Sequence, residues 1–295
     1  MAERIPLCEP WQSDLEAAYV ADALARNEIA QGEYIGRFDR AVAGYVGTRY
    51  AVAVSSGTAA LHLALLAAGV GPGDEVLVPD LTFIATANAV RYCGAMPVFV
   101  DVEPEHWQMD PERVASYLNT YCSWTRDGRL MSDRGRTVKA ILPVHLLGHP
   151  CDMMPLMRLT EHDRKIGIEI IEDMAEALGA RYSAYPNMGM THTVGHMGNI
   201  AACLSFNGNK IVTTGGGGMV LTDDEARATR VRYLANQAKD DPVEYRHSEV
   251  GYNYRLSNVQ AAIGCAQMET IAVRLAAKRR IAETYSEGLK GVPGI

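Results

Sequence analysis

The chain carries little positive charge, and its basic residues are scattered. Its 295 residues include 28 Lys and Arg against 35 Asp and Glu, which gives a formal net charge of −7 at pH 7. Proteins that bind nucleic acid concentrate Lys and Arg in a patch or stripe, and no dense basic block occurs in this sequence. We therefore expect no nucleic-acid partner.

Long apolar runs are also lacking. A helix that spans a bilayer needs roughly 18 to 20 consecutive apolar residues, and no stretch reaches that length. The first residues, MAERIPLCEPWQSDLEAAYV, carry charges where a signal peptide needs an apolar centre. The sequence therefore predicts neither a membrane partner nor a secretory leader.

Cysteines are few, and none forms a CxxC pair. The six are Cys8, Cys93, Cys122, Cys151, Cys203 and Cys265. This scatter favours a reduced, cytoplasmic protein without a disulfide framework or a thiolate zinc site. His145 and His149 lie four residues apart, but Gly148 and Pro150 argue against the helix that would bring both onto one metal ion. We therefore expect no metal.

The sequence does contain enough apolar residues for a large core. It is 48% hydrophobic and 21% charged, and its length suits two domains or one large α/β domain. Short apolar runs predict strands at 51–55, 75–78, 97–100, 140–144, 167–171, 201–205 and 219–221. Helical stretches between them include 58–68, 84–93 and 223–235. This alternation predicts an α/β fold with a mainly parallel, buried sheet.

Two further segments differ from this alternation. Residues 117–135 are polar, Arg-rich and aromatic, and we interpret them as a surface loop. Residues 256–289 show a long helical pattern without a strand signal or a proline. That helix leads to the end of the sequence and suggests the start of a further domain.

A glycine-containing turn, Ser55-Ser56-Gly57-Thr58, joins an expected strand to an expected helix. The N-terminus of a helix offers unpaired N–H groups and the positive end of the helix dipole, and Gly57 admits a closely approaching ligand. The turn therefore has the chemistry of a phosphate cradle. The alternative is a simple N-cap, in which Ser56 or Thr58 satisfies the helix start.

Two carboxylates, Glu172 and Asp173, end the strand expected at 167–171. Ligands bind at the carboxyl ends of parallel strands, and a carboxylate buried there needs a cation or hydrogen-bond donors. Asp173 is therefore a candidate binding residue. The alternative is a helix cap, because Glu176 follows at the spacing of a capping box.

A lysine follows the strand expected at 201–205, in the sequence SFNGNK that ends at Lys210, and four glycines come shortly after it. A lysine beside such turns holds a phosphate or bonds covalently to a carbonyl carbon, and burial favours its neutral, nucleophilic form. The alternative is an exposed loop lysine followed by a glycine-rich hairpin turn.

These motifs occur together in an order that resembles the sugar aminotransferases of the DegT/DnrJ/EryC1/StrS family. The matching stretches are the segment 55–104, AILPVHLLGHPCDM, IIEDMAEALGA, LSFNGNKIVTTGGGGMVLTDDE and VGYNYRLSNVQAAIGCAQ. The resemblance implies the large domain of a fold-type I enzyme that depends on pyridoxal 5′-phosphate (PLP).

The resemblance also implies a role for each matching residue. Lys210 matches the lysine that holds PLP covalently, and Asp173 matches the carboxylate that pairs with the pyridinium nitrogen. Gly57, Thr58 and Ser205 match the residues that bind the phosphate.

Three more positions match residues near the cofactor. Phe83 matches the aromatic residue that stacks on the ring, and Glu176 matches a position close to its phenolic oxygen. Asn253 matches a residue that reaches the cofactor phosphate of the partner subunit, which implies a homodimer with shared active sites.

The sequence departs from the family pattern at several places, including one residue near the glycine-rich turn and the end of the chain. Gly216 stands where the family usually has Glu. Family members also continue for several tens of residues into a small C-terminal domain. We therefore expect a PLP-binding large domain with an N-terminal arm at residues 1–255, followed at residues 256–295 by a long helix and an incomplete small domain.

The implied reaction moves an amino group from an amino acid, expected to be glutamate, to a nucleotide-linked 4-keto-6-deoxy sugar. Four of the matching segments most resemble the branch of the family that makes GDP-perosamine for surface polysaccharide from GDP-4-keto-6-deoxy-mannose. Alternatives are another dTDP- or UDP-linked keto sugar as acceptor, or a truncated relative that binds PLP without turnover. A nicotinamide oxidoreductase also fits the alternation of strands and helices, but the sequence lacks the dinucleotide-binding motif GxGxxG at a strand-to-helix turn.

Overall fold

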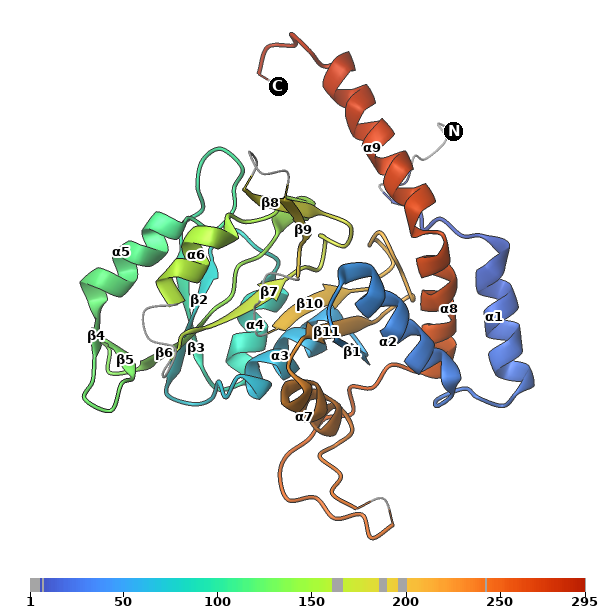
Figure 1. The fold of residues 1–295 in the computed structure, drawn as a ribbon, viewed down its shortest axis with the longest axis horizontal. Helices are drawn as coiled ribbons and strands as arrows, with labels where there is room; N and C mark the ends of the chain where they lie inside the picture. Colours follow the sequence, from blue (N-terminus) through green and yellow to red (C-terminus); the bar gives the residue numbers. More distant parts are fainter. Residues whose placement is uncertain are drawn as a thin grey trace.

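The computed structural model describes residue 6 and residues 8–160, 167–185, 190–195, 201–241 and 243–294. The helices within these residues are α1 (Asp14–Ala25), α2 (Glu33–Val46), α3 (Gly57–Ala67), α4 (Ile84–Tyr92), α5 (Pro111–Tyr121), α6 (Met153–Thr160), α7 (Glu225–Ala235), α8 (Asn258–Glu269) and α9 (Ile271–Gly288), with a 3₁₀ turn at Leu146–Gly148. The strands are β1 (Tyr50–Val54), β2 (Asp74–Pro79), β3 (Met96–Val100), β4 (Cys122–Trp124), β5 (Leu130–Ser132), β6 (Thr137–Ile141), β7 (Glu169–Asp173), β8 (Arg181–Tyr185), β9 (Met190–Thr193), β10 (Ala201–Ser205) and β11 (Gly218–Thr222). Figure 1 shows their arrangement.

The central sheet is mixed and mainly parallel, which confirms the predicted fold class. Its main path runs β1-β11-β10-β7-β6-β2-β3. The five strands from β10 to β3 pair in parallel, whereas β11 runs antiparallel to both of its neighbours. Because β1 and β10 flank β11, they point the same way as β7. The carboxyl ends of β1, β7 and β10 therefore lie at one edge of the sheet.

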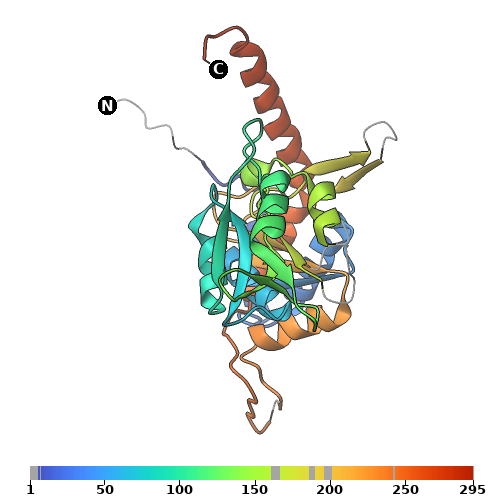
Figure 2. The same ribbon diagram turned by 90° about the vertical axis from the view of Figure 1, so that its left-hand side faces the viewer.

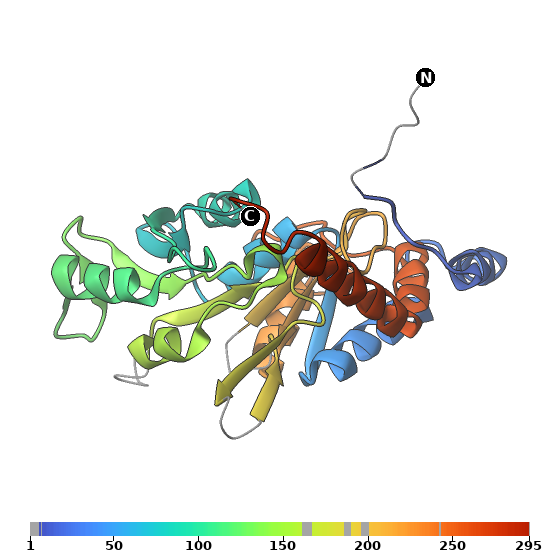
Figure 3. The ribbon, with the colours of Figure 1, turned by 90° about the horizontal axis from the view of Figure 1, so that it is seen from above.

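Helices cover both faces of this sheet, as alternating side chains require. Val52 and Val54 of β1 face the core shared with α3 and α7, whereas Ala51 and Ala53 face the core shared with α2 and α8. Seen from above, α2 lies on one side of the sheet and α4 on the other (Figure 3). A third core joins α5 and α6 to β2, β3 and β6.

Most predicted strands agree with the observed ones within two residues, but two segments need correction. The strand predicted at 140–144 begins three residues earlier, as β6. The segment 117–135 is no surface loop: it completes α5 and forms the β4–β5 hairpin, which extends the sheet beside β6. Its polar composition hid this because only alternating residues, such as Leu130 and Ser132, are buried.

The long helical pattern at 256–289 forms two helices rather than one. The break falls at Thr270, whose hydroxyl donates to the carbonyl of Ala266, while the Arg274 guanidinium donates to the carbonyl of Gln267. Helix α8 packs against α1 and α2 within the core, and α9 is largely exposed and rises away from the body (Figures 1 and 2). The division into domains at residue 255 stays a prediction.

Two negative findings concern the described residues alone. None of their helices is both long enough and apolar enough to cross a membrane. Within the same part of the chain, no cluster of His, Cys, Asp and Glu side chains is arranged to hold a metal ion.

Candidate active site

A cavity of about 550 Å³ opens where the carboxyl ends of β7 and β10 meet the start of α3. Its lining includes every site residue predicted from the sequence except one: Gly57, Thr58, Phe83, Asp173, Glu176, Ser205 and Lys210. The cavity therefore brings together, from four separate segments, side chains that are up to about 150 positions apart in the chain.

The start of α3 forms one wall of this cavity. Ser56 is the N-cap residue, and its hydroxyl accepts a hydrogen bond of 3.1 Å from the amide of Ala59. The amides of Gly57 and Thr58 belong to the first turn, where no helical carbonyl is available to them. A Cβ atom on Gly57 would lie 2.9 Å from the Cβ atom of Ser205, so only glycine fits beside this hydroxyl. The N-cap interpretation is therefore confirmed for Ser56. The phosphate cradle stays a prediction, and the same turn leaves backbone donors that suit an anion.

Asp173 ends β7 with its carboxylate facing the cavity. One oxygen accepts from the Thr86 hydroxyl at 2.9 Å, and the other accepts from the Ala175 amide at 3.1 Å. The residue is 5% exposed, and this burial raises the pKa of the Asp173 carboxyl above its usual value. No ion pair to Asp173 occurs among the described residues, so the site favours a ligand that brings a positive charge or a proton.

The helix-cap alternative for Asp173 is wrong. The residues after β7 form turns rather than a helix, and the carboxylate is held by Thr86 of α4 instead. Sequence reasoning did not identify Thr86. The available signal was its place in the first turn of α4, three residues after Phe83, where a side chain lies over the helix start.

Lys210 lies in the turn after β10 and reaches the same cavity. Its Nζ atom lies 3.1 Å from Oε1 of Glu176, and the other Glu176 oxygen accepts from the Leu147 amide at 2.8 Å. The Lys210 side chain is only 16% exposed. It is therefore no freely exposed loop lysine, and it lines the same cavity as Asp173.

Phe83 completes the cavity wall at the N-cap of α4. It is 75% exposed, although a large aromatic side chain is usually buried. Since its ring borders the same cavity as Lys210 and Asp173, this exposure presents a flat apolar surface to the cavity.

Asn253 is the predicted site residue that does not line this cavity. It is exposed, and its backbone pairs with that of Asn236. The flanking tyrosines pack on their own chain instead: the rings of Tyr252 and Tyr254 lie 4.7 Å and 6.0 Å from the ring of His62. Both tyrosines therefore pack within their own subunit.

His145 and His149 do not converge. His145 is buried and bonds Glu172 at 2.8 Å, whereas the ring of His149 stacks on that of His106 with centroids 4.5 Å apart.

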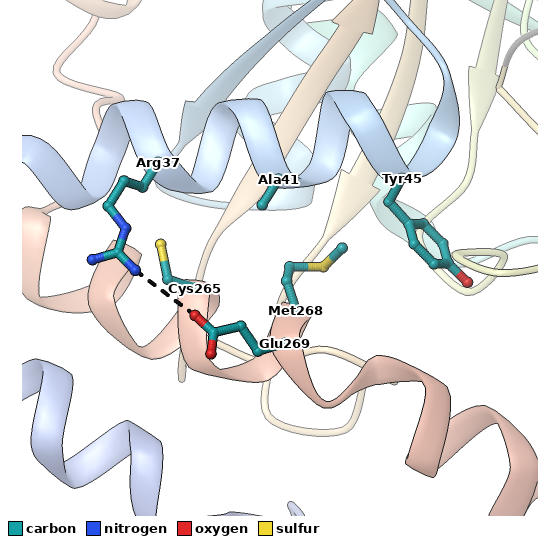
Figure 4. Close-up of a pocket in the computed structure, with 6 residues that line it drawn as sticks. All are labelled: Arg37, Ala41, Tyr45, Cys265, Met268 and Glu269. Atoms are coloured by element: carbon teal, nitrogen blue, oxygen red, sulfur yellow. Dashed lines mark ion pairs between the residues drawn. The ribbon is translucent and has the colours of Figure 1, made fainter.

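A separate cavity of about 310 Å³ lies between α2 and α8 (Figure 4). Arg37 on α2 and Glu269 on α8 form an ion pair of 3.7 Å across it, and the other labelled side chains are Ala41, Tyr45, Cys265 and Met268. None of the predicted site residues contributes to this cavity.

The chemistry of the larger cavity fits PLP. The start of α3 with Ser205 offers donors for a phosphate, and the close approach of Ser205 to Gly57 leaves room for nothing larger than glycine. Asp173 offers a buried carboxylate for a protonated ring nitrogen, Phe83 offers a flat surface, and Lys210 offers an amine for the aldehyde. The α/β fold and this donor set define the class, which is a PLP-dependent aminotransferase of fold type I.

Comparisons with known proteins agree with this class. Residues 11–295 match the DegT/DnrJ/EryC1/StrS aminotransferase family, and the chain belongs to that family. It is 41% identical to the GDP-perosamine synthase of Caulobacter vibrioides over 287 residues, which are 97% of this chain and 70% of that protein. The family match rules out the nicotinamide oxidoreductase alternative.

Two solved structures share this fold. DesV of S. venezuelae is 35% identical with a TM-score of 0.81, over 95% of this chain and 68% of that one. The sugar aminotransferase Spr1654 of Streptococcus pneumoniae in its PLP form is 25% identical with a TM-score of 0.83, over 98% of this chain and 72% of that one.

Proposed function

We propose that this chain binds PLP at Lys210 and transfers an amino group from an amino acid to a nucleotide-linked keto sugar. The observation that carries the proposal is the meeting of Lys210, Asp173 and the start of α3 around one cavity. Lys210 would hold the cofactor covalently, and Gly57, Thr58 and Ser205 would bind its phosphate. Asp173 would pair with its ring nitrogen, and Phe83 would cover its ring.

PLP, when bound, would supply an electron sink for the negative charge that develops at the α-carbon of the amino donor. The chain's own residues do the rest. Once the incoming amino donor has displaced Lys210 from the cofactor, the freed Lys210 amine would take the proton from that α-carbon and return one during the second half of the reaction. Asp173 keeps a proton on the ring nitrogen, because its buried carboxylate gains a cationic partner. Glu176, held by the Leu147 amide, positions the Lys210 amine.

We propose glutamate as the donor and GDP-4-keto-6-deoxy-mannose as the acceptor, with GDP-perosamine for surface polysaccharide as the product. Support for this acceptor comes from the Caulobacter relative, whose name states GDP-perosamine synthesis. A cytoplasmic location is part of the proposal, because the six cysteines are unpaired.

The first half-reaction tests the amino transfer directly. We would load the protein with PLP, record its visible spectrum and add glutamate. Loss of the visible band on addition of glutamate is the expected result, since the amino group is then stored on the cofactor. A band that no amino acid changes would instead favour a relative that binds PLP without turnover.

The acceptor assignment predicts a preference among nucleotide sugars. With glutamate as donor, a GDP-linked 4-keto-6-deoxy sugar should be aminated at least about tenfold faster than its dTDP or UDP counterparts, the ratio expected of a few lost contacts. A panel of these substrates, with products measured by mass, gives the ranking. Preference for a dTDP- or UDP-linked sugar would contradict the acceptor and leave the aminotransferase assignment intact.

We further propose a homodimer in which Asn253, with Arg255 beside it, reaches the cofactor phosphate of the partner subunit. Both residues are exposed and lie just before α8. A phosphate with up to two negative charges gains from donors beyond one helix end and two hydroxyls. A two-fold interface is reciprocal, so each subunit would complete the other's site.

Shared sites predict complementation between two inactive variants. Lys210→Ala and Asn253→Ala should each be severely impaired as homodimers. In every mixed dimer both lesions fall in one site and the other site is intact, so activity should return on mixing. The mixed activity, measured after subunit exchange is verified by native mass spectrometry, should approach that of one site per mixed dimer. An active monomer would contradict the shared site.

A further inference from the structure

The 3₁₀ turn Leu146–Gly148 borders the cavity and is held in an unusual shape. Leu147 has a φ of +56°, a conformation that residues other than glycine rarely adopt, and it is 77% exposed. Such a backbone persists only where its surroundings fix it. The turn presents the Leu147 amide to Glu176 at 2.8 Å, and Glu176 in turn contacts Lys210.

Gln108 fixes one side of this turn. It lies in the connection between β3 and α5 and is 4% exposed. Its side-chain oxygen accepts from the Leu146 amide at 3.1 Å, and its side-chain nitrogen donates to the Leu146 carbonyl at 3.3 Å and to the His106 carbonyl at 3.0 Å. One buried amide therefore pairs with both backbone groups of the residue that precedes Leu147.

A buried pair fixes the other side. The side chains of His145 and Glu172 are fully buried and meet at 2.8 Å. Nδ1 of His145 accepts from the Cys151 amide at 3.0 Å, so Nε2 carries the hydrogen and donates it to Glu172. The His145 amide donates to the carbonyl of Asp173 at 3.0 Å, which ties the start of the turn to the end of β7.

We propose that Gln108 is a positioning residue: by pairing with Leu146 it orients the Leu147 amide, and so holds the Glu176 carboxylate against Lys210. The His145–Glu172 pair fixes the start of the same turn. This role rests on the proposed function, in which Lys210 carries the cofactor.

The consequence is electrostatic. A carboxylate about 3 Å from the Lys210 nitrogen favours the protonated form of the bond between that nitrogen and the cofactor. If Gln108 no longer holds the turn, Leu147 relaxes from its positive φ and Glu176 loses its amide donor. The carboxylate then swings toward solvent, and the protonated form is less stable.

Gln108→Met tests this role, because methionine keeps the length of the side chain and removes both hydrogen bonds. We expect the pH midpoint of the visible absorbance change of the PLP-loaded protein to fall by roughly half to one unit, a three- to tenfold loss of proton affinity. Glu176→Gln should lower the midpoint as well, and the double variant should shift no further than Glu176→Gln alone. In the cofactor-free protein, the Leu147 amide should exchange its hydrogen faster in Gln108→Met.

Asn258→Leu is the matched control. Asn258 is also a buried amide that pairs with two backbone groups, at Tyr34 and Glu28, but it does not line the cavity. Its loss should lower stability and leave the midpoint unchanged. A wild-type midpoint in Gln108→Met, or a shift that adds fully to that of Glu176→Gln, would overturn the proposal. A wild-type protein without a cofactor band would instead contradict the proposed function.

Discussion

Lys210→Ala should bind PLP without covalent attachment and lose roughly 10³-fold or more in turnover. The loss combines two roles of the amine, attachment of the cofactor and proton transfer at the donor α-carbon, and general acid–base catalysis alone supplies about 10²–10⁴-fold. Binding should survive, because the start of α3 and Asp173 are unchanged. Steady-state turnover with glutamate and the keto sugar, together with the visible spectrum, measures both effects.

The matched control for this variant is Lys139→Ala. Lys139 lies within β6 and does not line the cavity. It should keep turnover within about twofold, as expected of a residue without contact to the site. Turnover retained in Lys210→Ala would remove Lys210 from the mechanism.

Asp173→Asn should keep the fold and lose roughly ten- to a hundredfold in turnover. Asparagine keeps the size of the side chain, and its oxygen and nitrogen can still pair with the Ala175 amide and the Thr86 hydroxyl. It removes the charge that holds the ring-nitrogen proton, and a hydrogen bond to a charged group is worth about 1.5–3 kcal/mol. Turnover near that of the wild type would show that the pair with the ring nitrogen contributes little.

The same variant should not destabilise the cofactor-free protein at neutral pH. Burial raises the pKa of the Asp173 carboxyl, so the folded state prefers its protonated form. The stability that this proton contributes is present below the usual pKa of about 4 and is lost as pH rises through the raised value. The melting temperature of Asp173→Asn relative to wild type should therefore rise as the pH increases from about 4, and should level off once the pH exceeds the raised pKa of the Asp173 carboxyl. If the melting temperature of Asp173→Asn fell relative to wild type as the pH increased, burial would not raise the pKa of the Asp173 carboxyl as described.

Much of the fold and site could be predicted because the decisive residues sit next to regular elements. Ser56 and Gly57 follow β1, Asp173 ends β7, and Lys210 follows β10. Strand order fixes which ends meet, and apolar runs reveal buried parallel strands well. The matching family motifs then add roles that the pattern alone leaves open.

The missed features depend on contacts between distant segments. Thr86 contacts Asp173 across 87 positions, and the amide of Gln108 reaches Leu146 across 38 positions. No periodic pattern in the neighbouring sequence distinguishes Thr86 or Gln108 from other polar residues. The left-handed conformation of Leu147 is equally hidden, because a leucine does not favour a positive φ and only the surrounding contacts impose it. The polar composition of residues 117–135 led to the wrong prediction of a surface loop, because the β4–β5 hairpin buries only one of its faces.

Covalent attachment of the cofactor to Lys210 is the central claim, and borohydride reduction followed by peptide mapping tests it most directly. The PLP-loaded protein is reduced, digested and analysed by mass spectrometry for the lysine that carries the reduced cofactor. The fold and the cavity predict a label on the peptide that contains Lys210, and no label in Lys210→Ala. A label on Lys139 or Lys239 instead would contradict the claim.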